Sequence, residues 1–194
     1  MSKRRGWLKL FCCAIFLVVC CVWMWPLFSQ AVQAFLQYPH ASYKKITQYL
    51  DDAYARNHNL PYYAGHRGID YDAPLKTPVY ASASGKVVRA ISTYGDGCSR
   101  NTNDSGGFGN HIIIAHPNGY HTIYAHLQKN SIKVTQGTTI EAGQQIGAVG
   151  SSGRTYGSDA CGTFEHLHFE VRSQRYGHQV NPYNPDAGCL FLGG

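Results

Sequence analysis

The sequence predicts a mainly β protein built on an antiparallel sheet, and two observations carry this prediction. Charged residues make up only 14% of the 194 residues, while glycine (21) and tyrosine (14) are abundant, which favours a turn-rich β protein over a helical bundle. From Tyr62 onward, short apolar runs alternate with turns rich in Gly, Ser and Asn. We therefore expect one β-rich domain, preceded by an N-terminal hydrophobic segment and a short amphipathic helix.

The first segment, residues 1–34, differs from the rest of the chain. Four basic residues near its start precede an apolar run from Leu10 to Phe28. This order is typical of an export signal, and the run is also long enough to cross a bilayer. Small residues such as Ala34 favour a cleaved signal peptide, whereas the length favours an uncleaved membrane anchor. In either case we expect the body of the protein to be extracytoplasmic: secreted, periplasmic or anchored to the cell membrane.

Residues 39–60 are predicted to form an amphipathic helix and a linker. Apolar side chains between Ile46 and Tyr54 follow the spacing of one helix face. Pro39 is a start signal and Asn57 is a stop signal. We expect the helix to run from about Pro39 to Asn57 and to pack between the hydrophobic segment and the domain that follows.

Residues 61–190 contain the predicted strands. The strands are expected at 79–81, 85–90, 111–115, 120–127, 138–140 and 145–149, with a last one that begins at His166. Pro117-Asn-Gly119 predicts a hairpin turn between two of them. Loops rich in Gly, Asp and Ser interrupt the pattern at 93–109 and 151–163. The pattern predicts a single domain without an internal repeat.

Three of the seven cysteines in the chain lie outside the hydrophobic segment. In an oxidising compartment we expect Cys98 to pair with Cys161, because both lie in polar loops that a disulfide would stabilise. Cys189 is then left over. Three reduced thiols remain the alternative.

The charge distribution argues against nucleic acid as a partner. Four of the 17 basic residues and none of the 11 acidic residues lie in the first segment, so the remainder is only mildly positive. The sequence has no Lys/Arg cluster that could follow a phosphate backbone. A mildly positive surface is compatible with an anionic cell wall. The sequence carries no signal for an oligomeric state.

Two polar motifs, His66-Arg-Gly-Ile-Asp70 and His166-Leu-His168, carry the chemistry of the chain. Alternate residues of a strand point to the same face, so His66 and Asp70 are expected to share one face, with open space at Gly68 between them. The two histidines of the second motif are expected to share another face. Two imidazoles and a carboxylate suit Zn²⁺, and three protein ligands leave a fourth position for water.

Residues near these motifs allow further roles. Glu170 shares a face with the last histidine and could support it, but a solvent-facing carboxylate is the preferred interpretation, because Glu is usually exposed. Asp72 is a rival ligand to the aspartate of the first motif. Tyr124 could contact an oxyanion or substrate. The same holds for Tyr62 and Tyr63, although packing is the preferred interpretation for these two.

The order of four motifs resembles that of the M23 metallopeptidases, the lysostaphin-like peptidoglycan endopeptidases. The stretch from His66 to Pro74 resembles their His-x-Gly-x-Asp-x-x-x-Pro signature, and Tyr124-Ala-His126 resembles their Tyr-x-His segment. A Gly-punctuated stretch at 137–150 and the closing His-x-His strand complete the match, which covers about 62–172. The resemblance implies a lysostaphin-type catalytic domain, an antiparallel fold described as a duplicated hybrid motif.

The resemblance also implies a role for each site residue. His66, Asp70 and His168 would bind one Zn²⁺ per chain, and His126 and His166 would be catalytic residues that do not bind the metal. Zinc polarises a scissile carbonyl and lowers the pKa of its bound water. An imidazole can accept that water's proton, and an imidazolium can stabilise the oxyanion. The division of these tasks between the two histidines is left open.

The leading function is therefore hydrolysis of peptide bonds in peptidoglycan stem peptides or cross-bridges. Its partners would be peptidoglycan, and the membrane if the N-terminal segment is uncleaved. A non-catalytic member of the same fold would instead bind cell wall or regulate an amidase, although such relatives typically lack some ligands and this chain lacks none. A cysteine hydrolase would use Cys161 or Cys98 with a histidine, but the loop setting and the predicted disulfide oppose it.

Overall fold

The computed structural model describes residues 36–43, 45–62, 64–95, 105–155, 165–175 and 177–183. All of them lie in one compact unit, Ala34–Gly194. The hydrophobic segment and Cys98, Cys161 and Cys189 lie outside the described residues, so the signal or anchor and the disulfide stay predictions. Within the described ranges, no helix is both long enough and apolar enough to span a membrane.

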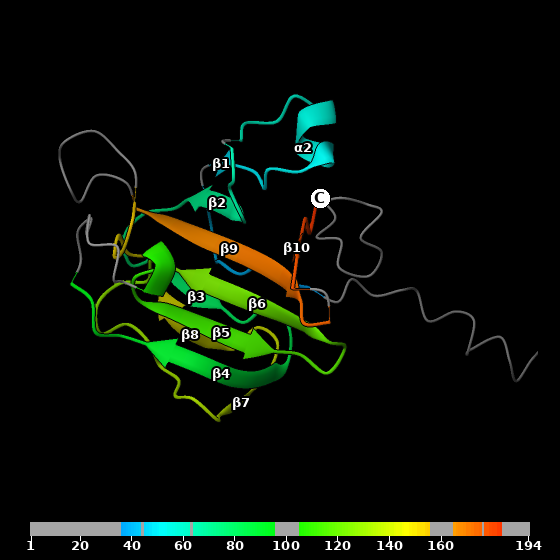
Figure 1. The fold of residues 1–194 in the computed structure, drawn as a ribbon. Helices are drawn as coiled ribbons and strands as arrows, with labels where there is room; N and C mark the ends of the chain where they lie inside the picture. Colours follow the sequence, from blue (N-terminus) through cyan, green and yellow to red (C-terminus); the bar gives the residue numbers. More distant parts are fainter. Residues whose placement is uncertain are drawn as a thin grey trace, which may run out of the picture. The chain divides into compact units, whose positions relative to one another are not determined.

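A large antiparallel sheet forms the body of this unit (Figure 1). The strand order is β1-β2-β9-β6-β5-β4-β7, and β10 pairs with the second half of β9. The strands are β1 Lys45–Gln48, β2 Ile69–Asp72, β4 Gly85–Ile91, β5 His111–Ala115, β6 Tyr120–Ala125, β7 Thr139–Ile140, β9 His166–Ser173 and β10 Gln179–Val180. A second sheet pairs β3 Pro78–Tyr80 with β8 Gln145–Ala148. The predicted fold class, a mainly antiparallel β protein, is confirmed.

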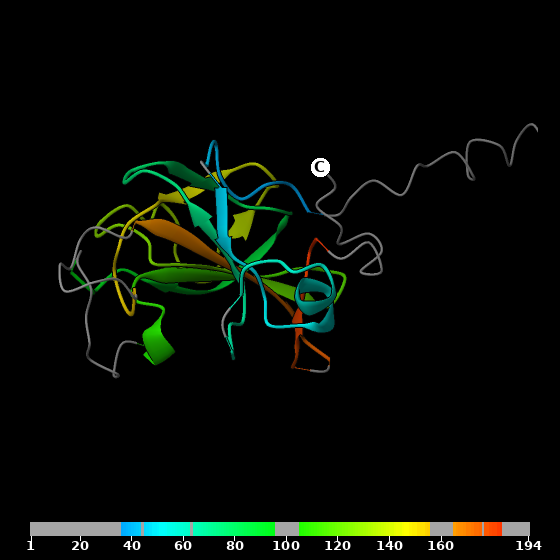
Figure 2. The ribbon, with the colours of Figure 1, turned by 90° about the horizontal axis from the view of Figure 1, so that it is seen from above.

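The hydrophobic core joins the two sheets. Seen from above, the small β3–β8 sheet lies on one side of the large sheet (Figure 2). One buried cluster contains Ile114 from β5, Phe169 from β9, Val79 from β3 and Ile146 from β8. Leu167, Phe169 and Val171 are at most 1% exposed, as the alternation along the last motif predicts.

Strand β9 organises the polar site because it lies between β2 and β6. Asp70 of β2 lies opposite His168, and Asp72 lies opposite His166. Ala125, the last residue of β6, lies opposite His168 from the other side. Directly opposed residues of an antiparallel pair carry their side chains on the same face. The register therefore places Asp70 beside His168 and brings His126 to the same end of the sheet.

The predicted helix over 39–57 is wrong in its bounds. Only Ala53–Asn57 (α2) is helical, and Lys45–Gln48 forms β1 instead. The open edge of β2 supplies hydrogen-bonding partners to β1, which outweighs a helical spacing in so short a stretch. Asp52 begins the helix, because its side chain accepts a hydrogen bond from the Ala55 amide (2.8 Å).

The other predicted strands are confirmed, with two changes next to the polar motifs. The hairpin turn between β5 and β6 forms as expected, with Gly119 at φ 82°. Strand β6 ends at Ala125, because His126 adopts φ 58°, a left-handed conformation that a strand cannot continue. Strand β2 begins only at Ile69, so His66 and Gly68 lie in the loop before it.

Candidate metal centre

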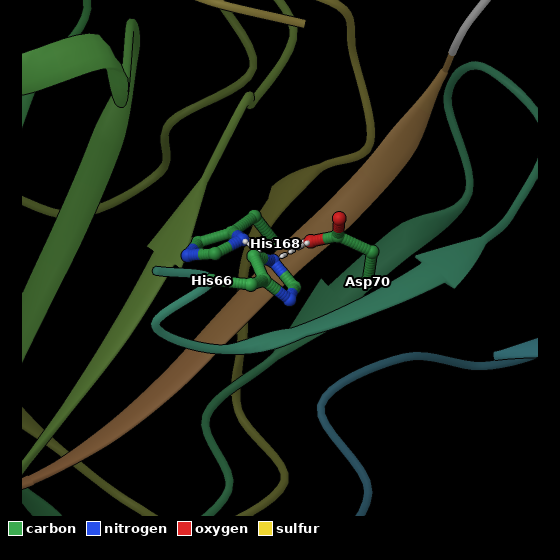
Figure 3. Close-up of side chains that lie close together, drawn as sticks. All are labelled: His66, Asp70 and His168. Atoms are coloured by element: carbon green, nitrogen blue, oxygen red, sulfur yellow. Dashed lines mark hydrogen bonds and ion pairs between the residues drawn. The ribbon is translucent and has the colours of Figure 1, made fainter. Parts of the chain in front are cut away.

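Three buried side chains meet where the loop before β2, β2 itself and β9 come together (Figure 3). The Nδ1 atom of His168 lies 2.7 Å from Oδ1 of Asp70. The Nε2 atom of His66 lies 3.2 Å from the same oxygen and 3.3 Å from Nδ1 of His168. Among the described residues this is a group of three whose ligand atoms all lie within 4.8 Å of one another.

In His66 and in His168, the second ring nitrogen forms a hydrogen bond to an oxygen atom. Nδ1 of His66 lies 2.7 Å from the carbonyl oxygen of Tyr49, and Nε2 of His168 lies 3.0 Å from Oε1 of Glu170. A carbonyl or carboxylate only accepts, so these nitrogens carry the protons. The opposite nitrogens, Nε2 of His66 and Nδ1 of His168, face Oδ1 of Asp70 and are the ring atoms placed to bind a metal.

Glu170 is held from two sides. Its Oε1 accepts from His168, and its Oε2 accepts from Nε of Arg172 in the same strand. The residue is 1% exposed. Burial opposes its charged form, but the hydrogen bond and positive charge of His168, followed by those of Arg172, hold the pKa of Glu170 below its usual range.

Charges within the cluster compensate one another. Burial opposes the ionisation of Asp70, yet the charge and hydrogen bond of His168 hold the pKa of Asp70 well below its usual range. Burial likewise opposes a charged His168, but Asp70 first and Glu170 next raise the pKa of His168 to about 9. The carboxylates of Asp70 and Glu170 thus lie on either side of His168, and their buried negative charges need a positive charge close by. Two imidazole nitrogens and one carboxylate oxygen around that position fit Zn²⁺.

His126 and His166 lie beside this group. Their ring centroids are 4.7 Å apart, and Nε2 of His166 is 3.9 Å from Oδ1 of Asp70. Nδ1 of His126 lies 2.8 Å from the carbonyl of Ser152, so it carries the proton and Nε2 is the basic nitrogen. Burial, and then the neighbouring His166 and His168, lower the pKa of His126 well below its usual value, which keeps this ring neutral.

The backbone supports the position of His126. Its N–H donates to the carbonyl of Phe108 (3.0 Å), and its carbonyl accepts from the Gly150 amide (3.0 Å). These bonds hold a left-handed conformation that costs a non-glycine residue about 1 kcal/mol or more. This backbone conformation directs the chain away from β6 at the residue where the His126 ring joins the cluster.

Comparison with known proteins identifies the family of this chain. The profile of peptidase family M23 matches residues 64–182. The chain belongs to peptidase family M23. The match contains the three candidate metal ligands and the two adjacent histidines.

Two similar curated proteins are named as peptidases, one of them as a peptidoglycan peptidase. The DD-carboxypeptidase/endopeptidase Mpg of Neisseria meningitidis is 41% identical over 117 residues, which are 60% of this chain and 22% of that protein. The peptidoglycan DD-endopeptidase ShyA of Vibrio cholerae is 35% identical over 140 residues, 72% of this chain and 27% of that protein. The aligned part of this chain thus spans about a quarter of these relatives' length.

Solved structures show the same M23 fold. A zinc-containing peptidase from Vibrio cholerae matches with a TM-score of 0.54 and 28% identity, covering 77% of this chain and 39% of that one. Lysostaphin from Staphylococcus simulans matches with a TM-score of 0.51 and 27% identity, covering 80% of this chain and 56% of that one. The predicted lysostaphin-type fold is confirmed.

Three expectations about residues of the M23 site need correction. Gly68 does not leave open space: a Cβ there would lie 2.5 Å from the Phe169 carbonyl oxygen and 2.8 Å from Cε1 of His168, because β9 fills that position. Glu170 is buried rather than solvent-facing, because His168 and Arg172 compensate its charge. Tyr124 is fully buried, and its hydroxyl accepts from the Ser82 amide (2.8 Å), which keeps it away from substrate.

Three further residues were considered for the site: Asp72, Tyr62 and Tyr63. Asp72 is half-buried and, within the described residues, is not a member of the ligand group. Tyr62 is 38% exposed, and Tyr63 lies outside the described residues.

Two partners of the site were missed by sequence reasoning. They are the backbone carbonyls of Tyr49 and Ser152, which fix the rings of His66 and His126. A carbonyl exists at every residue, so no residue type could have indicated these two.

Proposed function

We propose that the protein is a zinc-dependent endopeptidase that hydrolyses peptide bonds in peptidoglycan. The observation that carries the proposal is the joint placement of His66, Asp70 and His168 with two further histidines at one end of the sheet. Of the two relatives Mpg and ShyA, ShyA carries peptidoglycan in its name, which supports peptidoglycan as the substrate. Because both carry the DD designation, we further propose direct cross-links between stem peptides as the bond that is cut.

In this proposal His66 Nε2, Asp70 Oδ1 and His168 Nδ1 hold one zinc ion. Bound zinc supplies a Lewis acid that polarises the scissile carbonyl and lowers the pKa of a water molecule. His126 is neutral and presents Nε2 as a base, because Nδ1 is committed to the Ser152 carbonyl. It can therefore accept a proton from an attacking water.

His166 is suited to the complementary task. Its ring lies against His126, and Nε2 lies 3.9 Å from Asp70 Oδ1. An imidazolium there can stabilise the tetrahedral oxyanion or protonate the leaving amine. We propose His126 as the base and His166 as the electrophilic partner.

Domain organisation and location follow from the same proposal. Residues 61–190 form the peptidase domain, and residues 1–34 act as a signal peptide or membrane anchor. The body of the protein then works outside the cytoplasm, where peptidoglycan lies.

Digestion of two defined sacculi tests this function. The full chain is incubated with sacculi that carry direct cross-links and with sacculi that carry glycine bridges, and the released muropeptides are identified by mass. We expect cleavage of the direct cross-links, loss of activity with a zinc chelator, and recovery when zinc is restored. Activity that persists without zinc would contradict the metal mechanism, and wall binding without any turnover would favour a non-catalytic scaffold.

A further inference from the structure

A segment that lies before the family match contacts two of the three candidate metal ligands. The match begins at residue 64. The segment Thr47–Asp51, here called the clamp, contains the end of β1 and the turn that leads into α2. None of its side chains belongs to the ligand group or to the catalytic pair, so the proposed chemistry assigns it no role.

The clamp holds the His66 loop by three hydrogen bonds. The carbonyl of Tyr49 accepts from Nδ1 of His66 (2.7 Å). The Asp51 amide donates to the carbonyl of His66 (3.0 Å), and Oδ2 of Asp51 accepts from the Gly65 amide (2.9 Å). Ring and backbone of His66 are thus both fixed from the same short segment.

The clamp also holds Asp70 through β1. Gln48 is the register partner of Asp70 in the β1–β2 pair. The hydroxyl of Thr47 donates to the Asp70 carbonyl (3.2 Å). The two ligands on the β2 side therefore share one support.

The clamp is itself anchored. The Tyr49 amide donates to the carbonyl of Pro61 (2.7 Å), and Arg56 of α2 forms an ion pair with Oδ1 of Asp51. The helix is short, and Asp52 caps it by accepting from Ala55. Asp51 accordingly links α2 on one side to the His66 loop on the other.

We propose that the clamp sets the distance and orientation between His66 and Asp70, with Asp51 as a positioning residue for zinc binding. The inference rests on the proposed function, because it takes these side chains as zinc ligands. Without the Asp51 carboxylate, the Gly65 amide loses its acceptor and the His66 loop loses one of its three bonds. Gly65 has φ 79°, one of the many conformations open to glycine, and the bond from its amide to Asp51 selects it.

Zinc affinity of the full chain tests the clamp, measured by competition with a chromophoric chelator. Loss of partners that orient metal ligands typically weakens binding about 10- to 100-fold, so we expect Asp51→Ala to weaken zinc affinity about tenfold or more. Asp51→Asn keeps an oxygen that can accept from the Gly65 amide, and we expect it to restore most of the affinity. Asp52→Ala removes a carboxylate from the neighbouring cap instead. We expect that control to bind zinc like the wild type.

A second variant keeps the test decisive if Asp51→Ala does not fold. Thr47→Val keeps the shape and strand preference of the residue but removes the hydroxyl bonded to the Asp70 carbonyl. We expect it to fold with weaker zinc binding and faster zinc release. If folded Asp51→Ala binds zinc as tightly as the wild type, the role of the clamp is wrong, although the zinc site remains. If only Thr47→Val folds, wild-type zinc affinity in that variant leads to the same conclusion. Absence of zinc binding in the wild type would overturn the proposed function.

Discussion

Replacing Glu170 with glutamine isolates the contribution of the carboxylate behind His168. In the structure one oxygen of Glu170 accepts from Nε2 of His168 and the other accepts from Nε of Arg172. A glutamine has one acceptor oxygen and one NH₂ group, so it can satisfy only one of these two donors. The substitution keeps the size of the side chain and therefore leaves the packing of β9 in place.

The size of the effect follows from the bond that is lost. A hydrogen bond to a charged group contributes about 1.5–3 kcal/mol. If essentially all of this is expressed in the orientation of the His168 ring, zinc affinity falls about 10- to 100-fold, since about 1.4 kcal/mol corresponds to a factor of ten. We expect the dissociation constant for zinc to rise by that factor, and muropeptide release at limiting zinc to fall in parallel.

Chelator competition gives the zinc affinity, and far-UV circular dichroism checks the fold. Glu141→Gln is the matched control, because that carboxylate lies at the surface and accepts from the Ser84 hydroxyl (3.1 Å). It should bind zinc like the wild type. A folded Glu170→Gln variant with wild-type zinc affinity would refute the reasoning, because the carboxylate would then have no influence on the ligand.

Three further predictions concern stability and packing. Burial lowers the pKa of His40 to about 4, whereas in the unfolded chain it stays near 6.5. The unfolded state therefore takes up the proton first as the pH falls. The free energy of unfolding, measured with urea, should fall by about 3 kcal/mol between pH 6.5 and pH 4. His40→Phe should remove this pH dependence. Gly68→Ala drives a Cβ into β9 beside His168, and we expect about 1–3 kcal/mol lower stability together with loss of zinc, measured by thermal unfolding and metal analysis. Tyr124→Phe leaves the Ser82 amide without its acceptor and should cost about 1–3 kcal/mol in stability, with zinc content and turnover unchanged; a fall in turnover alone would restore a substrate role for Tyr124.

Alternation made the central strand of the site predictable from sequence. Leu167, Phe169 and Val171 had to face the core, which sent His166 and His168 to the opposite face. The hairpin at Gly119 was predictable for a similar reason, because its sequence allows few other conformations. The grouping of residues from distant motifs into one site came instead from the resemblance to M23 peptidases.

Other features depend on tertiary contacts that no local pattern contains. Lys45–Gln48 forms a strand only because the edge of β2 is there to pair with it. The need for glycine at 68 arises from the close approach of β9. Both features depend on two segments that are distant in the sequence, which is why local patterns gave the wrong expectation. Glu170 is different, because its partners His168 and Arg172 lie two residues away in the same strand, where the sequence already shows them.

The central claim is that neighbouring histidines of one motif have different tasks. His168 directs Nδ1 at Asp70 within the ligand group, whereas His166 lies against His126 beside it. The direct measurement is zinc content and muropeptide release for purified His166→Ala and His168→Ala, side by side with the wild type. The account predicts that His168→Ala loses zinc and activity, while His166→Ala keeps most of its zinc and still loses turnover. Equal loss of zinc in both variants, or full zinc content in His168→Ala, would contradict it.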